Sequence, residues 1–421
     1  MSNQLLQVAE SRPKDRKINA DMLSSIGGAP KATEIGGGHY AVTNIFGNIG
    51  FVVTEEGVVV VDAAVNEDVA KAVLSLIREI TAAPIKYLIY THGHGDHVKG
   101  APVFKREGAT IIAQRNVSRR FRRYTKFADY HARINGVQFA GGGFDGGRYW
   151  SEFVYPDIEY IDTYSFTLGG KEFILNHEYG ETDDATVVTV KADGVVYAGD
   201  LIIWAFPNIG NPNKVLRYEH EWAQALDKIA AGKPQHVIPG HGPVLSGEDV
   251  GAALYETGEA LRLLYEQAAK FINEGRDLDY IIENAVLPEN IKNSKYIPEV
   301  YGTREFVLRG IHRRYTGWYD GNPSNLNPAP KADVAKVIYE LIGNREKIIS
   351  KAKEIADGGN VRLALHILDL ALGGDPKEKE ALLLKSEYLR KLGNESHNLF
   401  YVNFYLAAAE RYQKAAEETG A

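Results

Sequence analysis

Cysteine is absent from the 421 residues. Its absence excludes a disulfide framework and any thiolate ligand, so a metal site in this protein must be built from histidine, aspartate and glutamate. The sequence also lacks an apolar run of about eighteen residues, and we therefore expect no membrane insertion. Residues 1–17 mix charges and have no apolar stretch typical of a signal peptide, which favours a cytoplasmic protein.

The sequence also has only a small excess of negative over positive charge. The net charge of −7 is mild for this length, so the overall balance does not indicate a nucleic-acid partner or an anionic membrane surface. At 44% hydrophobic residues the chain can bury ordinary cores, and its length predicts two domains or one domain with a large appendage.

The order of apolar patterns predicts an α/β fold followed by an all-α region. Strand-like runs and one amphipathic helix alternate up to residue 113, and strand patterns return from residue 163 to residue 239. From about residue 249 the pattern changes to long amphipathic helices. We therefore expect an N-terminal arm over 1–30, a catalytic domain over 31–248 with an insertion at about 115–158, and a helical domain over 249–421.

Four metal-ligand side chains lie within six residues directly after an apolar strand at 85–90. They are His92, His94, Asp96 and His97. Imidazole nitrogens and carboxylate oxygens suit a divalent ion such as zinc. A strand that leads into a turn containing glycine can direct these side chains toward one site. Further candidates follow later strands: His177 and Glu181, then Asp200, then His241. The first stretch is therefore interpreted as half of a two-metal site.

These motifs, taken in order, resemble the metallo-β-lactamase superfamily over residues 39–248. They are His92-x-His94-x-Asp96-His97, Tyr179-Gly180-Glu181-Thr182, Gly199-Asp200 and Pro239-Gly240-His241-Gly242. The resemblance implies a four-layer αβ/βα sandwich of two mixed sheets, with two divalent ions, most simply zinc, at one edge. It implies a first site of His92, His94 and a third ligand, and a second site of Asp96, His97 and His241. Asp200 would bridge the two sites, and Asp96 and Asp200 would take part in catalysis.

The third ligand of the first site decides the branch of the superfamily. Glu181 stands where the usual ligand is histidine, and this resembles the alkylsulfatase branch, whose first site also uses a carboxylate there. His177 lies four residues earlier and is the alternative ligand. We favour Glu181 because the Gly-x-Thr context fixes the ligand position, and we expect His177 beside the site or at a strand end.

The helical half supports the same branch. The segments 314–323, 325–326 and 403–406 resemble the dimerisation domain of alkylsulfatases, which would cover about 296–410. The resemblance predicts a homodimer through residues after 249, and the alternative is a cap over the catalytic domain of the same chain. Larger members carry a further sterol-carrier-like domain, which we expect this protein to lack.

Two departures leave the substrate open. The segment 201–208 replaces a segment with histidine and arginine in that branch, and Asp200 stands where the branch has glutamate. The leading hypothesis is hydrolysis of alkyl sulfate esters by a metal-bridging hydroxide. A lactone, thioester or phosphodiester is the alternative substrate, and a di-iron redox protein is less favoured.

The insertion carries many basic and aromatic residues between 115 and 139. The basic residues form either a solvated helix face or a surface that attracts a small anionic ester. Candidate substrate-binding residues, here and after Asp200, are Arg133, Tyr124, Trp204 and Asn208.

Overall fold

The structure is a computed structural model that describes residues 30–140 and 146–419. All but the last residue of the expected N-terminal arm therefore lies outside the described residues. The described residues divide into two compact units, one formed by 30–136 with 146–316 and the other by 137–140 with 317–419.

Two mixed sheets form the centre of the first unit. In the described ranges, the first sheet has seven strands in chain order: β1 (Lys31–Gly36), β2 (His39–Thr43), β3 (Ile49–Thr54), β4 (Gly57–Val61), β5 (Ile85–Ile89), β6 (Thr110–Gln114) and β7 (Ile158–Tyr160). The second has six, in the order β13 (Leu245–Ser246), β12 (His236–Pro239), β11 (Val195–Gly199), β10 (Ala185–Val190), β9 (Lys171–Glu178) and β8 (Thr163–Leu168). Strands β4 to β7 run parallel to one another, as do β11 and β12.

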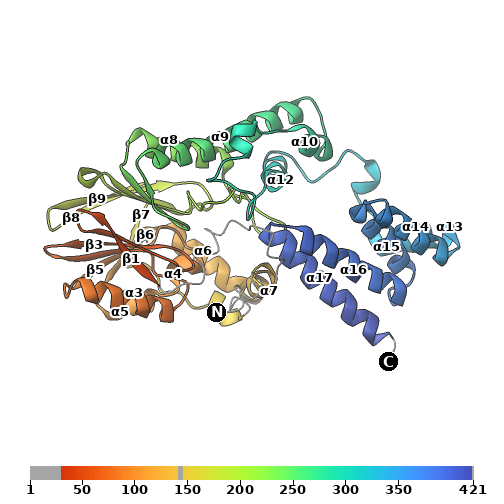
Figure 1. Cartoon of the computed structure of the whole chain (residues 1–421), viewed down its shortest axis with the longest axis horizontal. Coiled ribbons are helices and arrows are strands. Elements are labelled where there is room, and N and C mark those ends of the chain that lie inside the picture. Colours follow the sequence, from red (N-terminus) through yellow and green to blue (C-terminus); the bar gives the residue numbers. More distant parts are fainter. Residues whose placement is uncertain (1–29, 141–145, 420–421) are drawn as a thin grey trace. The chain divides into compact units, whose positions relative to one another are not determined.

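Helices cover the outer face of each sheet (Figure 1). Helices α3 (Glu67–Ile80) and α5 (Ala101–Arg106) share a buried apolar cluster with the first sheet. A second cluster lies between the two sheets and includes Val59 and Ile89 from one, and Phe173 and Val188 from the other. Helices α8 (Glu219–Ala231) and α9 (Glu248–Asn273) pack on the second sheet. The predicted αβ/βα layer order is confirmed.

Local sequence explains the segment β4–α3–β5, which leads to the histidine-rich motif. Helix α3 begins after Asn66, whose side chain accepts a hydrogen bond from the Val69 amide, and its buried residues Val73 and Ile77 face the sheet. The five residues of β4 are all buried because both faces of this central strand are covered. Parallel pairing of β4 with β5 brings the carboxyl ends of both strands to the same edge.

The insertion after β6 is largely helical. It contains α6 (Asn116–Lys126), α7 (Ala128–Gln138) and the short 3-10 helix η1 (Gly147–Trp150). Its last residues add β7 to the first sheet, in parallel with β6. The end of the expected insertion is therefore part of the sheet.

The helical part of the chain begins with α9, close to the expected position. However, α9, α10 (Leu278–Asn284), α11 (Glu289–Lys292) and α12 (Arg304–Tyr315) share one buried cluster with the second sheet. The first compact unit therefore extends to Thr316, beyond the boundary expected near residue 249. The extension arises because the apolar faces of α9 and α12 are buried together with that sheet.

The second unit is all-α in its described part. It contains η3 (Pro323–Asn325), α13 (Lys331–Ile342), α14 (Arg345–Asp357), α15 (Val361–Gly374), α16 (Lys379–Glu395) and α17 (Leu399–Glu418). Helices α13 to α16 surround a cluster that includes Ile348, Leu368 and Tyr388. Within the described ranges, no helix is both long enough and apolar enough to cross a bilayer.

Candidate metal centre

The histidine-rich loop between β5 and α4 (Gly95–Val98) is held by Asp62, the residue that follows β4. The Asp62 carboxylate accepts hydrogen bonds from the Thr91 amide and hydroxyl, both at 2.7 Å. It also lies 2.8 Å from Nδ1 of His97. A proton on Nδ1 satisfies this contact and leaves Nε2 of His97 as the free donor facing the centre.

The other candidate donors follow strands of the second sheet at the same edge. Glu181 lies in the turn between β9 and β10, Asp200 directly follows β11, and His241 follows β12. The second sheet is tied to the histidine loop by a hydrogen bond of 2.6 Å from the Thr186 amide to the Thr91 carbonyl. Topology therefore gathers residues separated by about 150 positions in the sequence.

The turn that carries His241 is fixed by two further residues. The Asn48 side chain donates hydrogen bonds to the carbonyls of Pro239 and Gly242, at 3.0 and 2.8 Å. A Cβ atom at Gly240 would lie 1.9 Å from Oδ1 of Asp200. Glycine is therefore required at position 240 if Asp200 is to keep its place.

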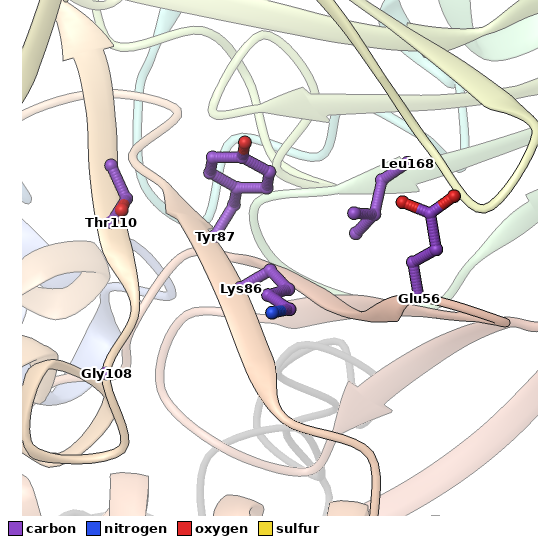
Figure 2. Close-up of a pocket in the computed structure, with 6 residues that line it drawn as sticks. All are labelled: Glu56, Lys86, Tyr87, Gly108, Thr110 and Leu168. Carbon is purple, nitrogen blue, oxygen red and sulfur yellow. The ribbon is translucent and has the colours of Figure 1, made fainter.

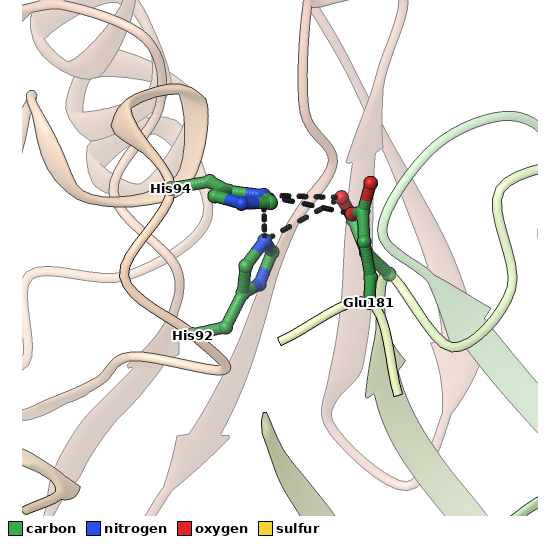
Figure 3. A group of neighbouring side chains, drawn as sticks. His92, His94 and Glu181 are labelled. Carbon is green, nitrogen blue, oxygen red and sulfur yellow. Dashed lines mark hydrogen bonds and ion pairs between the residues drawn. The ribbon is translucent and has the colours of Figure 1, made fainter. Parts of the chain in front are cut away.

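The first donor group contains His92, His94, Glu181 and Asp200, whose ligand atoms lie within 4.8 Å of one another. Figure 3 shows the two imidazoles and the Glu181 carboxylate directed toward a common point. Nδ1 of His94 lies 2.9 Å from Nε2 of His92 and 3.5 Å from Oε2 of Glu181. Oδ2 of Asp200 lies 3.4 Å from Nε2 of His92.

The second donor group contains Asp96, His97 and His241. Oδ2 of Asp96 lies 3.5 Å from Nε2 of His97 and 3.3 Å from Nε2 of His241. Oδ1 of Asp200 lies 3.2 and 3.4 Å from the same two nitrogens. Asp200 therefore presents one carboxylate oxygen to each group.

The donor set fits two divalent ions. Ligands placed about 2.0–2.1 Å from a tetrahedral zinc ion are separated from each other by about 3.3 Å, close to most of these spacings. Three of the donor atoms are buried without a hydrogen-bond partner among the described residues: Nε2 of His97, Oε2 of Glu181 and Oδ1 of Asp200. Buried polar atoms are rarely left unsatisfied, so an ion at this position would supply the missing partner.

The electrostatics of the second group also favour a cation. Burial opposes the charged form of His241, but Asp200 and Asp96 outweigh it and raise the pKa of this histidine to about 9. The pKa of His97 is likewise raised well above its usual value, because Asp200, Asp96 and Asp62 outweigh burial. The acidic groups around both rings therefore favour positive charge at this place.

Arg217 is the buried cation next to the first group. Its guanidinium donates a hydrogen bond to Oε1 of Glu181 and another, 2.9 Å long, to the Asn208 carbonyl. Burial lowers the pKa of Arg217 to about 10, so the side chain keeps its charge at neutral pH. The contact holds one Glu181 oxygen and leaves the other, Oε2, toward His94.

His177, the alternative ligand, lies outside both donor groups. It belongs to β9, and its Nε2 is 3.0 Å from the Asp183 carbonyl. That contact keeps the ring beside the turn that carries Glu181.

The four candidate substrate residues have different surroundings. Tyr124 is buried against His131 and Trp150. Arg133 is exposed, with its guanidinium over the Tyr130 ring. Trp204 donates to the Pro243 carbonyl, beside the His241 turn. Asn208 is fully buried, and its carbonyl accepts from Arg217.

Sequence reasoning missed Asp62 and Arg217. The only available signal for Asp62 was its position directly after a buried strand adjacent to β5. Arg217 had no such signal, because its contact with Glu181 depends on how the segment 201–218 folds back.

A separate surface cleft of about 490 Å³ lies at the opposite ends of β5 and β6 (Figure 2). It is lined by Glu56, Lys86, Tyr87, Gly108, Thr110 and Leu168. Lys86 is near the start of β5, whereas the histidine loop follows its end, so the cleft shares no residue with either donor group.

Comparisons with known families agree with this architecture. Residues 42–241 match the metallo-beta-lactamase superfamily, and residues 278–415 match the alkyl sulfatase dimerisation family. The second match begins inside the first compact unit and ends in the second.

The individual relatives of this chain include alkylsulfatases. The chain is 26% identical over 380 residues to a linear primary-alkylsulfatase from a Pseudomonas species, covering 84% of this chain and 72% of that protein. It is 25% identical over 399 residues to an (R)-specific secondary-alkylsulfatase from Pseudomonas, covering 86% of this chain but 59% of the relative. The solved structure of the inverting sec-alkylsulfatase Pisa1 from Pseudomonas has the same fold, with a TM-score of 0.82 at 20% identity over 98% of this chain and 77% of that one.

Proposed function

Because this chain joins a metallo-β-lactamase superfamily domain to an alkylsulfatase dimerisation domain, we propose that it is a dinuclear metal-dependent hydrolase of alkyl sulfate esters. The observation that supports a dinuclear centre is the position of Asp200, which presents one oxygen to each donor group. The relatives that name alkyl sulfates as substrates support the substrate class.

In this proposal His92, His94 and Glu181 hold one ion, Asp96, His97 and His241 hold the other, and Asp200 bridges them. The absence of cysteine and the nitrogen and oxygen donors are compatible with zinc as the metal. When bound, two such ions supply Lewis acidity and lower the pKa of the hydrolytic water.

The protein's own residues position this centre. Asp62 fixes the ring of His97 through Nδ1, and Arg217 fixes one oxygen of Glu181. His94 stays neutral, since burial and His92 hold its pKa well below the usual value. The centre is thus preorganised for ions and for an anionic ester.

Sulfate release from a short-chain alkyl sulfate, assayed with zinc present, tests the proposed activity. We expect turnover by the wild-type protein and its loss in His94→Ala. A matched panel containing a lactone, a thioester and a phosphodiester separates the alternatives. Turnover of one of these without sulfate release would refute the substrate class, and iron in place of zinc in purified protein would support the redox alternative.

The ligand assignment has its own test. Metal content is measured for Glu181→Ala and for His177→Ala. We expect Glu181→Ala to lose one of two ions and His177→Ala to keep both. Loss of metal in His177→Ala alone would show that His177 is the ligand.

We also propose a homodimer formed through the helical region. Helix α13 packs one face on α15, where Ala335 meets Gly373 and Tyr339 meets Gly374. Four further apolar residues of this helix, Val334, Val337, Ile338 and Leu341, are 47, 54, 36 and 82% exposed. An exposed stripe at this helical spacing is typical of an interaction face, and it lies within the match to the dimerisation family.

A further inference from the structure

Three basic side chains beside the metal centre lack acidic partners. Within the described part of the chain, Arg123, His131 and Lys214 form no ion pair with a carboxylate. Nε of Arg123 and Nδ1 of His131 are buried without a hydrogen-bond partner. Nζ of Lys214 donates to Oδ1 of Asn135 at 2.5 Å. Arg123 and Lys214 act on each other electrostatically and neither forms an ion pair within the described ranges, so the excess positive charge favours an anion at this place.

An aromatic wall connects this cluster to the histidine loop. A Cβ atom at Gly95 would lie 2.6 Å from the Tyr149 hydroxyl, so Tyr149 packs directly on the loop that carries His94 and Asp96. The neighbouring Trp150 ring is 5.4 Å from the His131 ring, and Nζ of Lys214 is 5.8 Å from the Trp150 ring. Asp96, on the same loop, also acts electrostatically on Lys214, so Lys214 lies near the second donor group.

Lys214 differs from its neighbours in proton affinity. Burial lowers its pKa to about 7, with Asp96 opposing the shift and Arg123 adding to it. Burial and the charges of Lys214 and Arg123 lower the pKa of His131 to about 3, so that ring is already neutral at pH 7. Burial raises the pKa of Tyr301, which also faces Asp96, to about 12. A general acid works best when its pKa is near the working pH.

We propose that Lys214 is a catalytic residue that donates a proton to the leaving alkyl oxygen during cleavage of the sulfate ester. The proposal rests on the sulfatase function above. A water molecule releases one proton to the solvent, and the resulting hydroxide forms a new bond to sulfur while the bond between sulfur and the alkyl oxygen breaks. Both electrons of that bond pass to the oxygen, which takes a proton from Nζ and leaves as the alcohol. The hydrogensulfate formed returns a proton to the Lys214 amine and leaves as sulfate.

The decisive variant is Lys214→Arg, which keeps a positive charge but does not release a proton at neutral pH. It is assayed with octyl sulfate, whose alkoxide needs a proton, and with nitrophenyl sulfate, whose phenolate leaves without one. We expect a loss of about 100-fold or more on octyl sulfate, and a loss at least about tenfold smaller on nitrophenyl sulfate. Lys214→Met should show the same selectivity, with full metal content in both variants.

The pH profile gives an independent readout. On octyl sulfate, wild-type turnover should fall as the pH rises through the pKa of Lys214, because the amine loses the proton that it donates. The charged and titratable groups that act on Lys214 are Asp96, Arg123 and His131. Arg123→Met removes a like charge, so this alkaline limb should move to higher pH.

Several results would overturn the inference. If Lys214→Arg keeps wild-type turnover on both esters, Lys214 is only a charge that binds the anion. Equal losses on both esters would contradict proton donation as well. In water labelled with heavy oxygen, label in the alcohol instead of the sulfate would show that the carbon–oxygen bond breaks. If the wild-type protein hydrolyses neither ester, the proposed function fails first and the role of Lys214 fails with it.

Discussion

Asp62 belongs to neither donor group, yet its carboxylate contacts the histidine loop at two residues, Thr91 and His97. It fixes the backbone where the loop leaves β5, and it fixes the tautomer of one ligand. Carboxylates in this position raise metal affinity without touching the metal.

Replacing Asp62 by asparagine should therefore weaken metal binding. The oxygen of the asparagine side chain can still accept a hydrogen bond from the Thr91 amide. The side-chain nitrogen would then face Nδ1 of His97, and it cannot accept a hydrogen bond. We expect metal affinity to fall by about 10- to 100-fold, measured by competition with a chelator.

Asp193→Asn is the matched control. Asp193 likewise contacts a fully buried histidine, with Oδ2 at 2.8 Å from Nε2 of His39, but neither residue belongs to a donor group. Its metal affinity should stay at the wild-type level. An equal fall in both variants would mean that general destabilisation, and not orientation of His97, lowers the affinity.

At the residue scale, the sequence indicated candidate donors that the structure brings together, but it did not indicate the residues that hold them in place. His92, Glu181, Asp200 and His241 each follow a strand, and strand ends at one edge of a sheet meet in space. The roles of Arg217 and Lys214 depend on the path of an irregular segment after Asp200, which no periodic pattern describes. Their side chains were therefore not identified from the sequence.

Among the structural elements, the turn after β12 is closely packed against the candidate metal centre. It carries His241, it is tied to the β2–β3 connection through Asn48, and Gly240 lies against Asp200. The backbone of this turn and the bridging carboxylate must therefore fit together.

Gly240→Ala should disturb both ion sites together. The added Cβ would overlap Oδ1 of Asp200, so either the carboxylate or the turn must move. We expect loss of metal from both sites and destabilisation of about 1–3 kcal/mol, measured by metal analysis and by thermal unfolding.

Gly251→Ala provides the comparison for this substitution. Gly251 lies in α9, is exposed, and has no heavy atom within 4 Å of an added Cβ. Alanine there should stabilise the protein by about 0.5–1 kcal/mol without changing metal content. Full metal content in Gly240→Ala would contradict the close fit at Asp200.

For the whole molecule, the sequence predicted the layer order and the start of the helical part but not the extent of the first unit. The change from strands to helices near residue 249 is visible as a change of hydrophobic period. That α9 to α12 complete the outer layer of the second sheet is a property of tertiary packing, since an amphipathic helix does not specify which surface its apolar face covers.

The assembly predicted for the whole molecule can be tested on α13. Two aspartates, in the double variant Val337→Asp with Leu341→Asp, place charges on the exposed stripe without entering the cluster around Leu368. We expect the wild-type protein to sediment as a dimer at micromolar concentration and the double variant to sediment as a monomer.

Ile80→Asp is the control for this experiment. Ile80 is 40% exposed at the end of α3 in the first unit, so a charge there tests the effect of an added aspartate alone. It should leave the dimer intact. A wild-type monomer, or a double variant that still dimerises, would count against the stripe as the interface.

In the proposed dinuclear centre, the carboxylate of Asp200 would link the two ion sites thermodynamically. Because Oδ2 faces one donor group and Oδ1 faces the other, occupancy of one site would change the affinity of the other by an equal factor in both directions. Loading of the centre should therefore follow a single coupled isotherm rather than two independent ones, and the availability of the second ion controls how firmly the first is held.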